Sequence, residues 1–133
     1  MSSPFMQTVE QCARDSHAGA ASFGQIVAAL AQAGVESYYA DYRRRSTSYY
    51  AADGATHAVT LHAPDLPIPA AFDAAALQSA IRGAQRGEVI YREFMRLSMS
   101  AGCVGYIVWI AGRHVSYFGH RGEVHIEAFP ASE

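Results

Sequence analysis

Two spacings of hydrophobic residues alternate along this chain, one typical of helices and one typical of strands. Ser3 and Pro4 form a helix start, and Gly19 is suited to end that helix. A second helix is predicted between Ser22 and Gly34, where apolar residues recur every three or four positions on one face. The first third of the chain is therefore expected to contain a pair of helices.

After the second helix the residues become rich in aromatic and β-branched side chains, which is typical of strands. The expected strands cover about residues 36–42, 45–52 and 55–62. Arg43-Arg44 and Asp53-Gly54 are the predicted two-residue turns between them. Together these elements form one unit, a pair of helices followed by a three-stranded meander.

The same unit recurs 68 residues further on, because a shift of that length aligns Val9–Thr60 with Leu77–Ala128 without an insertion. The identical pairs are Arg14/Arg82, Gly19/Gly87, Ala33/Ala101, Gly34/Gly102, Tyr38/Tyr106, Arg45/Arg113, Ser48/Ser116, Tyr49/Tyr117, Gly54/Gly122 and His57/His125. Helices from Asp73 to Gly87 and from Ile90 to Gly102 are expected. Ile90 replaces the capping Ser22, so this helix start should be weaker by about 1 kcal/mol.

The length of 133 residues fits a single α+β domain with an internal duplication. Its pseudo-repeats would span about 1–62 and 72–130, joined by the proline-rich linker 63–71. The two meanders are expected to share one core, with an antiparallel sheet packed by helices on one face. The order in which the meanders join is open.

The predicted turns assign side chains to two faces of the sheet. Tyr38 would oppose Tyr49, and Tyr106 would oppose Tyr117, on the helix-covered face. The other apolar residues expected on that face are Val108, Ile110, Val115, Val124 and Ile126. On the opposite face, the turns would pair Tyr50 with His57 and Phe118 with His125, which places an imidazole against an aromatic ring in each unit.

That opposite face mixes aromatic and titratable residues and suits a small ligand, a protein partner or a homodimer interface. The candidate ligand-binding residues are His57, His125, Trp109, Tyr50, Phe118, Ser48, Ser116, Asp41, His114 and Glu127. No catalytic residue and no metal ligand is assigned among them.

Three chemical interpretations of these residues were weighed. His57 and His125 are compatible with a general base or a shared metal site, but a structural role for strand histidines is favoured, and the histidine spacing is not that of a zinc site. Ser116, His125 and Glu127 resemble a hydrolytic triad without a nucleophile elbow. Arg43-Arg44 falls in a hairpin turn and is interpreted as a solvated loop.

Charge and composition exclude several classes of protein. The net charge of -2 argues against a binder of nucleic acid or of a membrane surface. Cys12 and Cys103 lie far apart, which predicts buried thiols of a reducing compartment. Residues 1–11 lack the features of a secretory signal, and no apolar run reaches the length of a membrane span. We therefore expect a cytoplasmic protein, and no cofactor, since nucleotide-binding fingerprints are missing.

Residues 85–130, QRGEVIYREFMRLSMSAGCVGYIVWIAGRHVSYFGHRGEVHIEAFP, resemble the YbcV-like bacterial and prophage proteins, a family of unknown function. The matching positions are Gln85 and Gly87, Tyr91 and Phe94, Gly102, Tyr106 and Trp109, Tyr117 and Phe118, and Glu127 and Pro130. Cys103 and Ile90 depart from the pattern. Some relatives are labelled phage envelope proteins, which implies a mobile-element history, and the resemblance carries over no catalytic residue.

Three functions follow as hypotheses. The first is an accessory binding module that uses the polar and aromatic sheet face for a small ligand, a peptide or a second copy. The second is a small enzyme with a histidine general base in a deep pocket. The third is a phage-derived structural or inhibitory protein with a flat apolar interface and no pocket. Duplication favours the first, because a pseudo-symmetric cleft is a common place for a ligand.

Overall fold

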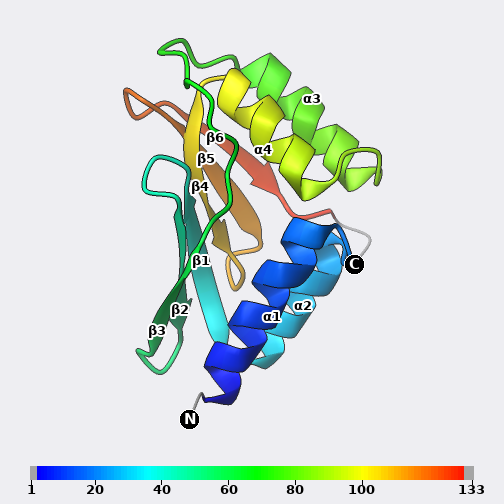
Figure 1. Ribbon diagram of the computed structural model, residues 1–133, viewed down its shortest axis with the longest axis vertical. Coiled ribbons are helices and arrows are strands. Elements are labelled where there is room, and N and C mark those ends of the chain that lie inside the picture. Colours follow the sequence, from blue (N-terminus) through cyan, green and yellow to red (C-terminus); the bar gives the residue numbers. More distant parts are fainter. Residues whose placement is uncertain (1–2, 131–133) are drawn as a thin grey trace.

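Each half of the chain contributes two helices and three strands, and the strands merge into one antiparallel sheet (Figure 1). The computed structural model describes residues 3–130. The elements are α1 (Pro4–Ala18), α2 (Phe23–Gln32), β1 (Val35–Asp41), β2 (Ser46–Ala51), β3 (Thr56–Thr60), α3 (Ala74–Gln85), α4 (Tyr91–Ser100), β4 (Cys103–Trp109), β5 (His114–Gly119) and β6 (Val124–Ala128). The sheet order is β3-β2-β1-β4-β5-β6, with the helices on one face. The α+β class expected from the sequence is confirmed.

The helices begin and end where capping residues predict. The Ser3 hydroxyl accepts a hydrogen bond from the Met6 amide, 3.1 Å away, and Gly19 closes α1 with a left-handed φ of 71°. At α2, Ser22 and Gln25 form a complete capping box. Ile90 makes no side-chain cap at α4, as expected from the sequence.

The two halves are related by a pseudo-twofold axis at the centre of the sheet. β1 pairs with β4 in antiparallel fashion, and Tyr39 lies opposite Ile107. These two residues are 68 positions apart, so each is the repeat equivalent of the other. A strand pair that matches equivalent residues in this way places the axis through that pair, and the helix pairs then stand on either side of it.

The hairpins β1-β2 and β4-β5 have the predicted register, with Tyr38 opposite Tyr49 and Tyr106 opposite Tyr117. Their loops are longer than expected, with four residues each, 42–45 and 110–113.

The last loop residue is left-handed in both hairpins, with φ of 60° at Arg45 and 59° at Arg113. The Arg45 guanidinium donates to the Ala63 carbonyl, whereas the Arg113 guanidinium lies over the Phe129 ring, 5.2 Å from its centre. The repeated arginines therefore anchor the chain that follows the third strand of each unit, and within residues 3–130 neither of them pairs with a carboxylate.

The outer hairpins differ from the prediction by one residue. The Ala51 amide donates to the Ala55 carbonyl, at 2.8 Å, so the loop holds three residues, 52–54, with Gly54 left-handed. The Gly119 amide donates to the Glu123 carbonyl in the same way. The prediction of a two-residue turn at Asp53-Gly54 is therefore wrong.

This single step turns β3 and β6 over, because side chains alternate between faces along a strand. Tyr49 opposes His57 and Tyr117 opposes His125, so the expected pairs of these histidines with Tyr50 and Phe118 do not form. His57, His125 and Glu127 lie on the helix-covered face. Val124 and Ile126, expected to be covered by helices, are exposed on the outer face of the sheet.

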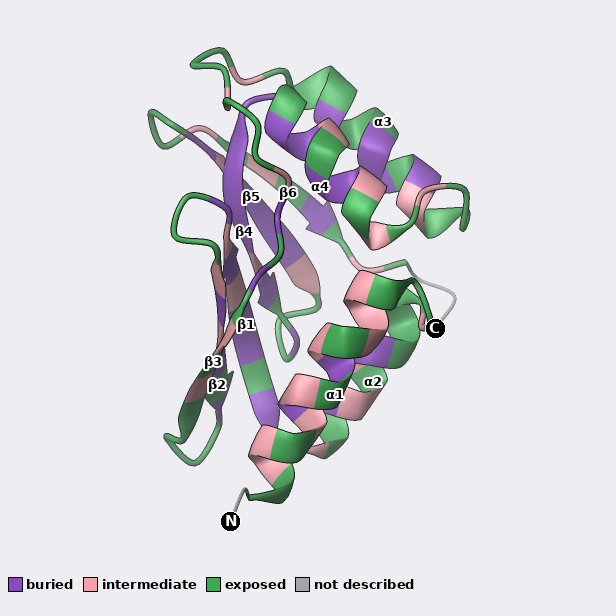
Figure 2. Ribbon diagram, in the orientation of Figure 1, coloured by how far each residue is buried: buried purple, intermediate pink, exposed green. Residues whose placement is uncertain are grey.

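The hydrophobic core lies between the helices and the sheet, where the buried sides of the helices face the strands (Figure 2). Leu30, Leu77 and Met95 are completely buried there. Tyr42, after β1, places its hydroxyl 2.8 Å from the Ser98 hydroxyl of α4. The segment between β3 and α3 contributes Leu61 and Ala63 to the same core, so the linker packs against both halves.

Gly34 and Gly102 provide a matched test of this packing, since they occupy the same place in the two units with φ of 89° and 91°. A Cβ on Gly34 would meet open space, but a Cβ on Gly102 would lie 2.1 Å from the Ala71 carbonyl oxygen. We expect Gly34→Ala to lower the free energy of unfolding by about 1 kcal/mol and Gly102→Ala by about 3 kcal/mol. Urea denaturation measures both values, and equal losses would contradict the close contact with the linker.

Candidate functional site

A cavity of about 430 Å³ lies on the helix-covered face of the sheet, between the α1-α2 pair and the α3-α4 pair. Its floor includes Tyr38, Tyr49, Tyr106 and Tyr117 from the central strands. All described lining residues except Ala20 and Gln25 occur as pairs 68 positions apart. The cavity therefore lies on the pseudo-twofold axis and is a product of the duplication.

The tyrosine floor is almost closed to bulk solvent. The exposed fractions of Tyr38, Tyr49, Tyr106 and Tyr117 are 6%, 5%, 7% and 7%. The rings of Tyr38 and Tyr49 stack at 5.2 Å with 24° between their planes. Burial raises the pKa of all four phenols above the ordinary value of 10, so each keeps its proton at neutral pH.

Tyr91 of α4 forms a hydrogen bond with the hydroxyl of Tyr106, one of these four tyrosines. Its hydroxyl lies 2.7 Å from that of Tyr106, and burial raises its own pKa to about 12 although the hydrogen bond with Tyr106 opposes the shift. In the first unit the equivalent position is Phe23, which has no hydroxyl. Tyr38, the equivalent of Tyr106, therefore lacks this partner.

Three hydroxyls on the floor are without a protein partner among residues 3–130, namely those of Tyr38, Tyr49 and Tyr117. No side-chain nitrogen or oxygen in that range is both sealed from solvent and unpaired. These hydroxyls must then reach the space of the cavity, where a water molecule or a ligand can accept their hydrogen bonds.

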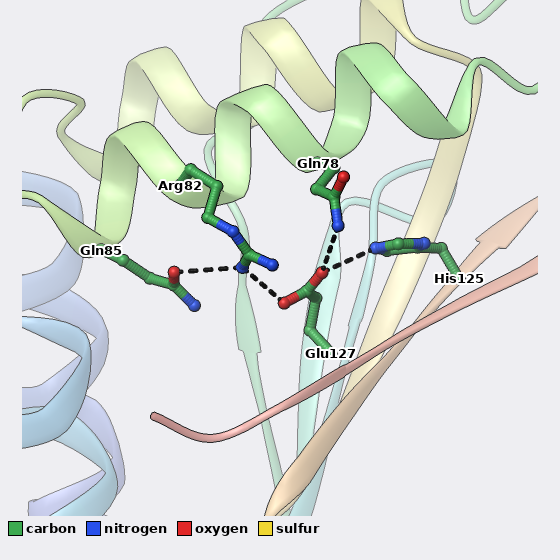
Figure 3. A network of polar contacts seen from close by, with 5 residues as sticks. All are labelled: Gln78, Arg82, Gln85, His125 and Glu127. Carbon is green, nitrogen blue, oxygen red and sulfur yellow. Dashed lines mark hydrogen bonds and ion pairs between the residues drawn. The ribbon is translucent and has the colours of Figure 1, made fainter. Parts of the chain in front are cut away.

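One wall carries a network around Glu127 of β6 (Figure 3). Its carboxylate is 2.7 Å from an Arg82 nitrogen and 2.9 Å from His125 Nε2, and Gln78 donates to it at 3.4 Å. Burial alone would raise the pKa of this carboxyl, but the bonds from Arg82, His125 and Gln78 outweigh it and hold the pKa below its usual 4.5. Glu127 is therefore a compensated carboxylate at neutral pH.

In the first unit the repeated histidine contacts a carboxylate from a different element. His57, the equivalent of His125, lies 2.9 Å from Glu10 of α1, and Val59 occupies the position that Glu127 has in the second unit. The carboxylate thus moves from a helix to a strand between the units. Only in the second unit does it line the cavity, so the two ends of the cavity are chemically different.

The other end of the cavity carries two imidazoles. His17 of α1 and His62 lie with their rings 5.4 Å apart and tilted by 56°. Both line the cavity, at positions where the second unit has Gln85 and Pro130. A molecule held in the cavity therefore meets imidazoles towards the first unit and a carboxylate towards the second.

The structure separates the residues predicted from the sequence. Glu127 is the one among them that lines the cavity. His57 and His125 are beside the helices, each engaged by a glutamate. The remaining candidates lie on the outer face of the sheet, and they are Asp41, Ser48, Tyr50, Trp109, His114, Ser116 and Phe118.

The outer face does not assemble a hydrolytic triad. Ser116 accepts a hydrogen bond from Trp109 Nε1 at 3.2 Å, and it lies across the sheet from His125 and Glu127. Within residues 3–130, no group of three or more histidine, cysteine, aspartate or glutamate residues is arranged to hold a metal ion. No helix in that range is both long and apolar enough to span a bilayer.

Sequence reasoning missed the cavity because it assigned the repeated tyrosines to the core. Their burial was predicted correctly, but their hydroxyls were not accounted for. A signal was present in the sequence, since tyrosine recurs at both Tyr38/Tyr106 and Tyr49/Tyr117 although phenylalanine would fill a core with no polar atom to satisfy.

The Glu127 network predicts a pH-dependent contribution to stability. Because the folded pKa lies below the unfolded value near 4.5, the stabilisation is complete above that pH and is lost as the pH falls through the folded pKa. We expect Glu127→Gln to lower the free energy of unfolding by about 2 kcal/mol at pH 7, with the difference from wild type shrinking below about pH 4.5. Urea denaturation of wild type and variant across pH 3–7 measures this difference in the free energy of unfolding.

The matched control is Glu36→Gln, since Glu36 is an exposed strand carboxylate and should change stability by less than about 0.5 kcal/mol. A loss in Glu127→Gln that stays constant down to pH 3 would contradict the depressed pKa.

Comparison with known proteins places this architecture in a family. The model of the family described as "Protein of unknown function (DUF1398)" matches residues 21–128. The uncharacterized protein Rv2012 of Mycobacterium tuberculosis (strain ATCC 25618 / H37Rv) and the uncharacterized protein Mb2035 of Mycobacterium bovis are each 36% identical over 63 residues. That match covers 47% of this chain and 38% of each relative, so the chain spans less than two fifths of their length. Since the family model covers most of the sequence, the chain belongs to this DUF1398 family, for which no function is established.

Proposed function

We propose that this protein is a binding module that holds a small, mostly apolar molecule in the cavity between its two helix pairs and the sheet. The observation that carries the proposal is the cavity itself, about 430 Å³ in volume and built on the pseudo-twofold axis. Ligand sites typically occupy about 300–1,000 Å³ and combine an apolar lining with a few placed polar groups.

The lining has this composition. Ile26, Phe94 and Phe129 provide apolar surface, while the hydroxyls of Tyr38 and Tyr49 provide polar points. The cavity is partly open to solvent, so its apolar lining is in contact with water, and covering such surface is favourable. A bound molecule would cover the lining and offer acceptors to the hydroxyls, which supports a ligand as its occupant.

A histidine general base has less support. A catalytic base must reach its substrate to within a hydrogen bond or one water molecule. His57 and His125 do not line the cavity, and their Nε2 atoms lie 2.9 Å from Glu10 and Glu127 respectively. The arrangement favours a structural role for both histidines, which was also the favoured interpretation of the sequence.

The outer face of the sheet is the second candidate surface, as a contact with a second copy of the chain. Tyr50, Trp109 and Ile126 expose 40%, 38% and 61% of their surface there. This face is the one on which the sequence placed the ligand. The cavity is favoured because it is concave and presents unpaired donors, so the test below compares the two surfaces.

The proposal predicts that filling the cavity abolishes binding. Four probes of similar size and different charge are suitable: tetralin, 1-tetralone, 2-naphthoate and 1-naphthylmethylammonium. Ala84 of α3 lines the cavity. Ala84→Trp should therefore lower the affinity for any probe that the wild type binds, by at least about 10-fold. Thr56→Trp is the control, because Thr56 is exposed on β3 and does not line the cavity.

Ligand-observed NMR titrations measure these affinities, and circular dichroism confirms that both variants fold. Loss of binding in Thr56→Trp but not in Ala84→Trp would move the site to the outer face. Absence of binding by all four probes to the wild type would overturn the proposal.

A further inference from the structure

This inference rests on the proposed function and names the class of ligand. We infer that the cavity takes a neutral molecule with an apolar ring system and a carbonyl oxygen, and that this oxygen accepts hydrogen bonds from the hydroxyls of Tyr38 and Tyr49.

Two hydroxyl donors of the first unit line the cavity without an acceptor from the described residues. Tyr38 and Tyr49 are each more than nine-tenths buried, line the cavity and have no partner among the described residues. In the second unit, Tyr91 satisfies the hydroxyl equivalent to that of Tyr38. The first unit has Phe23 in that place, so an acceptor has to come from outside the protein. Water that reaches these hydroxyls can accept from them, and a ligand that displaces this water has to supply an acceptor in its place or lose affinity.

The geometry of the two tyrosines suits a single acceptor atom. Tyr38 and Tyr49 are cross-strand neighbours whose rings stack nearly parallel, with centroids 5.2 Å apart. Both rings therefore stand on the helix-covered face of the sheet and line the same cavity. A carbonyl oxygen has two lone pairs and can accept from two such donors at once. Because the phenols remain protonated at neutral pH, each of them acts as a donor to this oxygen.

The charges around the cavity favour a neutral ligand. The described lining contains no arginine, its imidazoles His17 and His62 lie towards the first unit, and its wall towards the second unit carries the Glu127 carboxylate. An anionic group bound beside Glu127 would therefore meet a like charge. A cationic ligand gains little from Glu127, because Arg82 already compensates this carboxylate at 2.7 Å. A neutral ligand avoids both costs.

The test measures the affinities of the four probes for the wild type, Tyr38→Phe and Tyr49→Phe by NMR titration. We expect the wild type to bind 1-tetralone about 10-fold more tightly than tetralin, since two hydrogen bonds separate the probes. It should bind 2-naphthoate and 1-naphthylmethylammonium more weakly than 1-tetralone. Each Phe variant should lower the affinity for 1-tetralone about 3- to 5-fold and change the affinity for tetralin less than about 2-fold.

Tyr50→Phe is the matched control, because Tyr50 is exposed on the outer face of the sheet and does not line the cavity. This variant should leave the preference for 1-tetralone over tetralin unchanged. If the wild type binds both probes equally in a manner that Ala84→Trp abolishes, the ligand class is wrong and the binding function stands. Tighter binding of 2-naphthoate than of 1-tetralone would likewise contradict the ligand class and leave the binding function intact. If no probe depends on the cavity, the binding function itself fails.

Discussion

The antiparallel pairing of β1 with β4 is the interaction on which the rest of the structure depends. It joins two three-stranded meanders into one six-stranded sheet and places Tyr39 against Ile107, its own repeat equivalent. Each meander carries its helix pair with it, so the two pairs stand side by side on one face (Figure 1). The cavity occupies the space between them, over tyrosines from β1, β2, β4 and β5. Without this pairing there would be neither a shared core nor a cavity between the helix pairs.

Local features of the fold could be predicted from the sequence, and non-local ones could not. The capping residues Ser3 and Ser22 and the opposed tyrosines Tyr38 and Tyr49 were all placed correctly. The outer hairpins were not, because an Asp-Gly pair suits a two-residue turn as well as a three-residue loop that ends in a left-handed glycine. One residue of error there moved His57 and His125 to the wrong face. The β1-β4 pairing depends on contacts distant in sequence, and no local pattern predicts it.

The duplication also explains how the site acquired two different ends. Equivalent positions hold Tyr91 and Phe23, and likewise Glu127 and Val59. In the second unit these residues complete their own hydrogen bonds, Tyr91 with Tyr106 and Glu127 with Arg82. In the first unit the corresponding hydroxyl is left open to the cavity. Tyr49 and Tyr117 are alike in having no partner among the described residues, so the two halves differ at the two positions above, and they offer a bound molecule two chemically different ends.

The central claim is that the helix side of the sheet, not its outer face, binds the ligand. Chemical-shift mapping of the aromatic rings during a titration with 1-tetralone tests it most directly, because the two faces carry different tyrosines. The account predicts that the ring signals of Tyr38, Tyr49 and Tyr117 shift in a saturable manner while those of Tyr50 and Trp109 stay in place. Shifts confined to Tyr50 and Trp109 would contradict it and would assign binding to the outer face of the sheet.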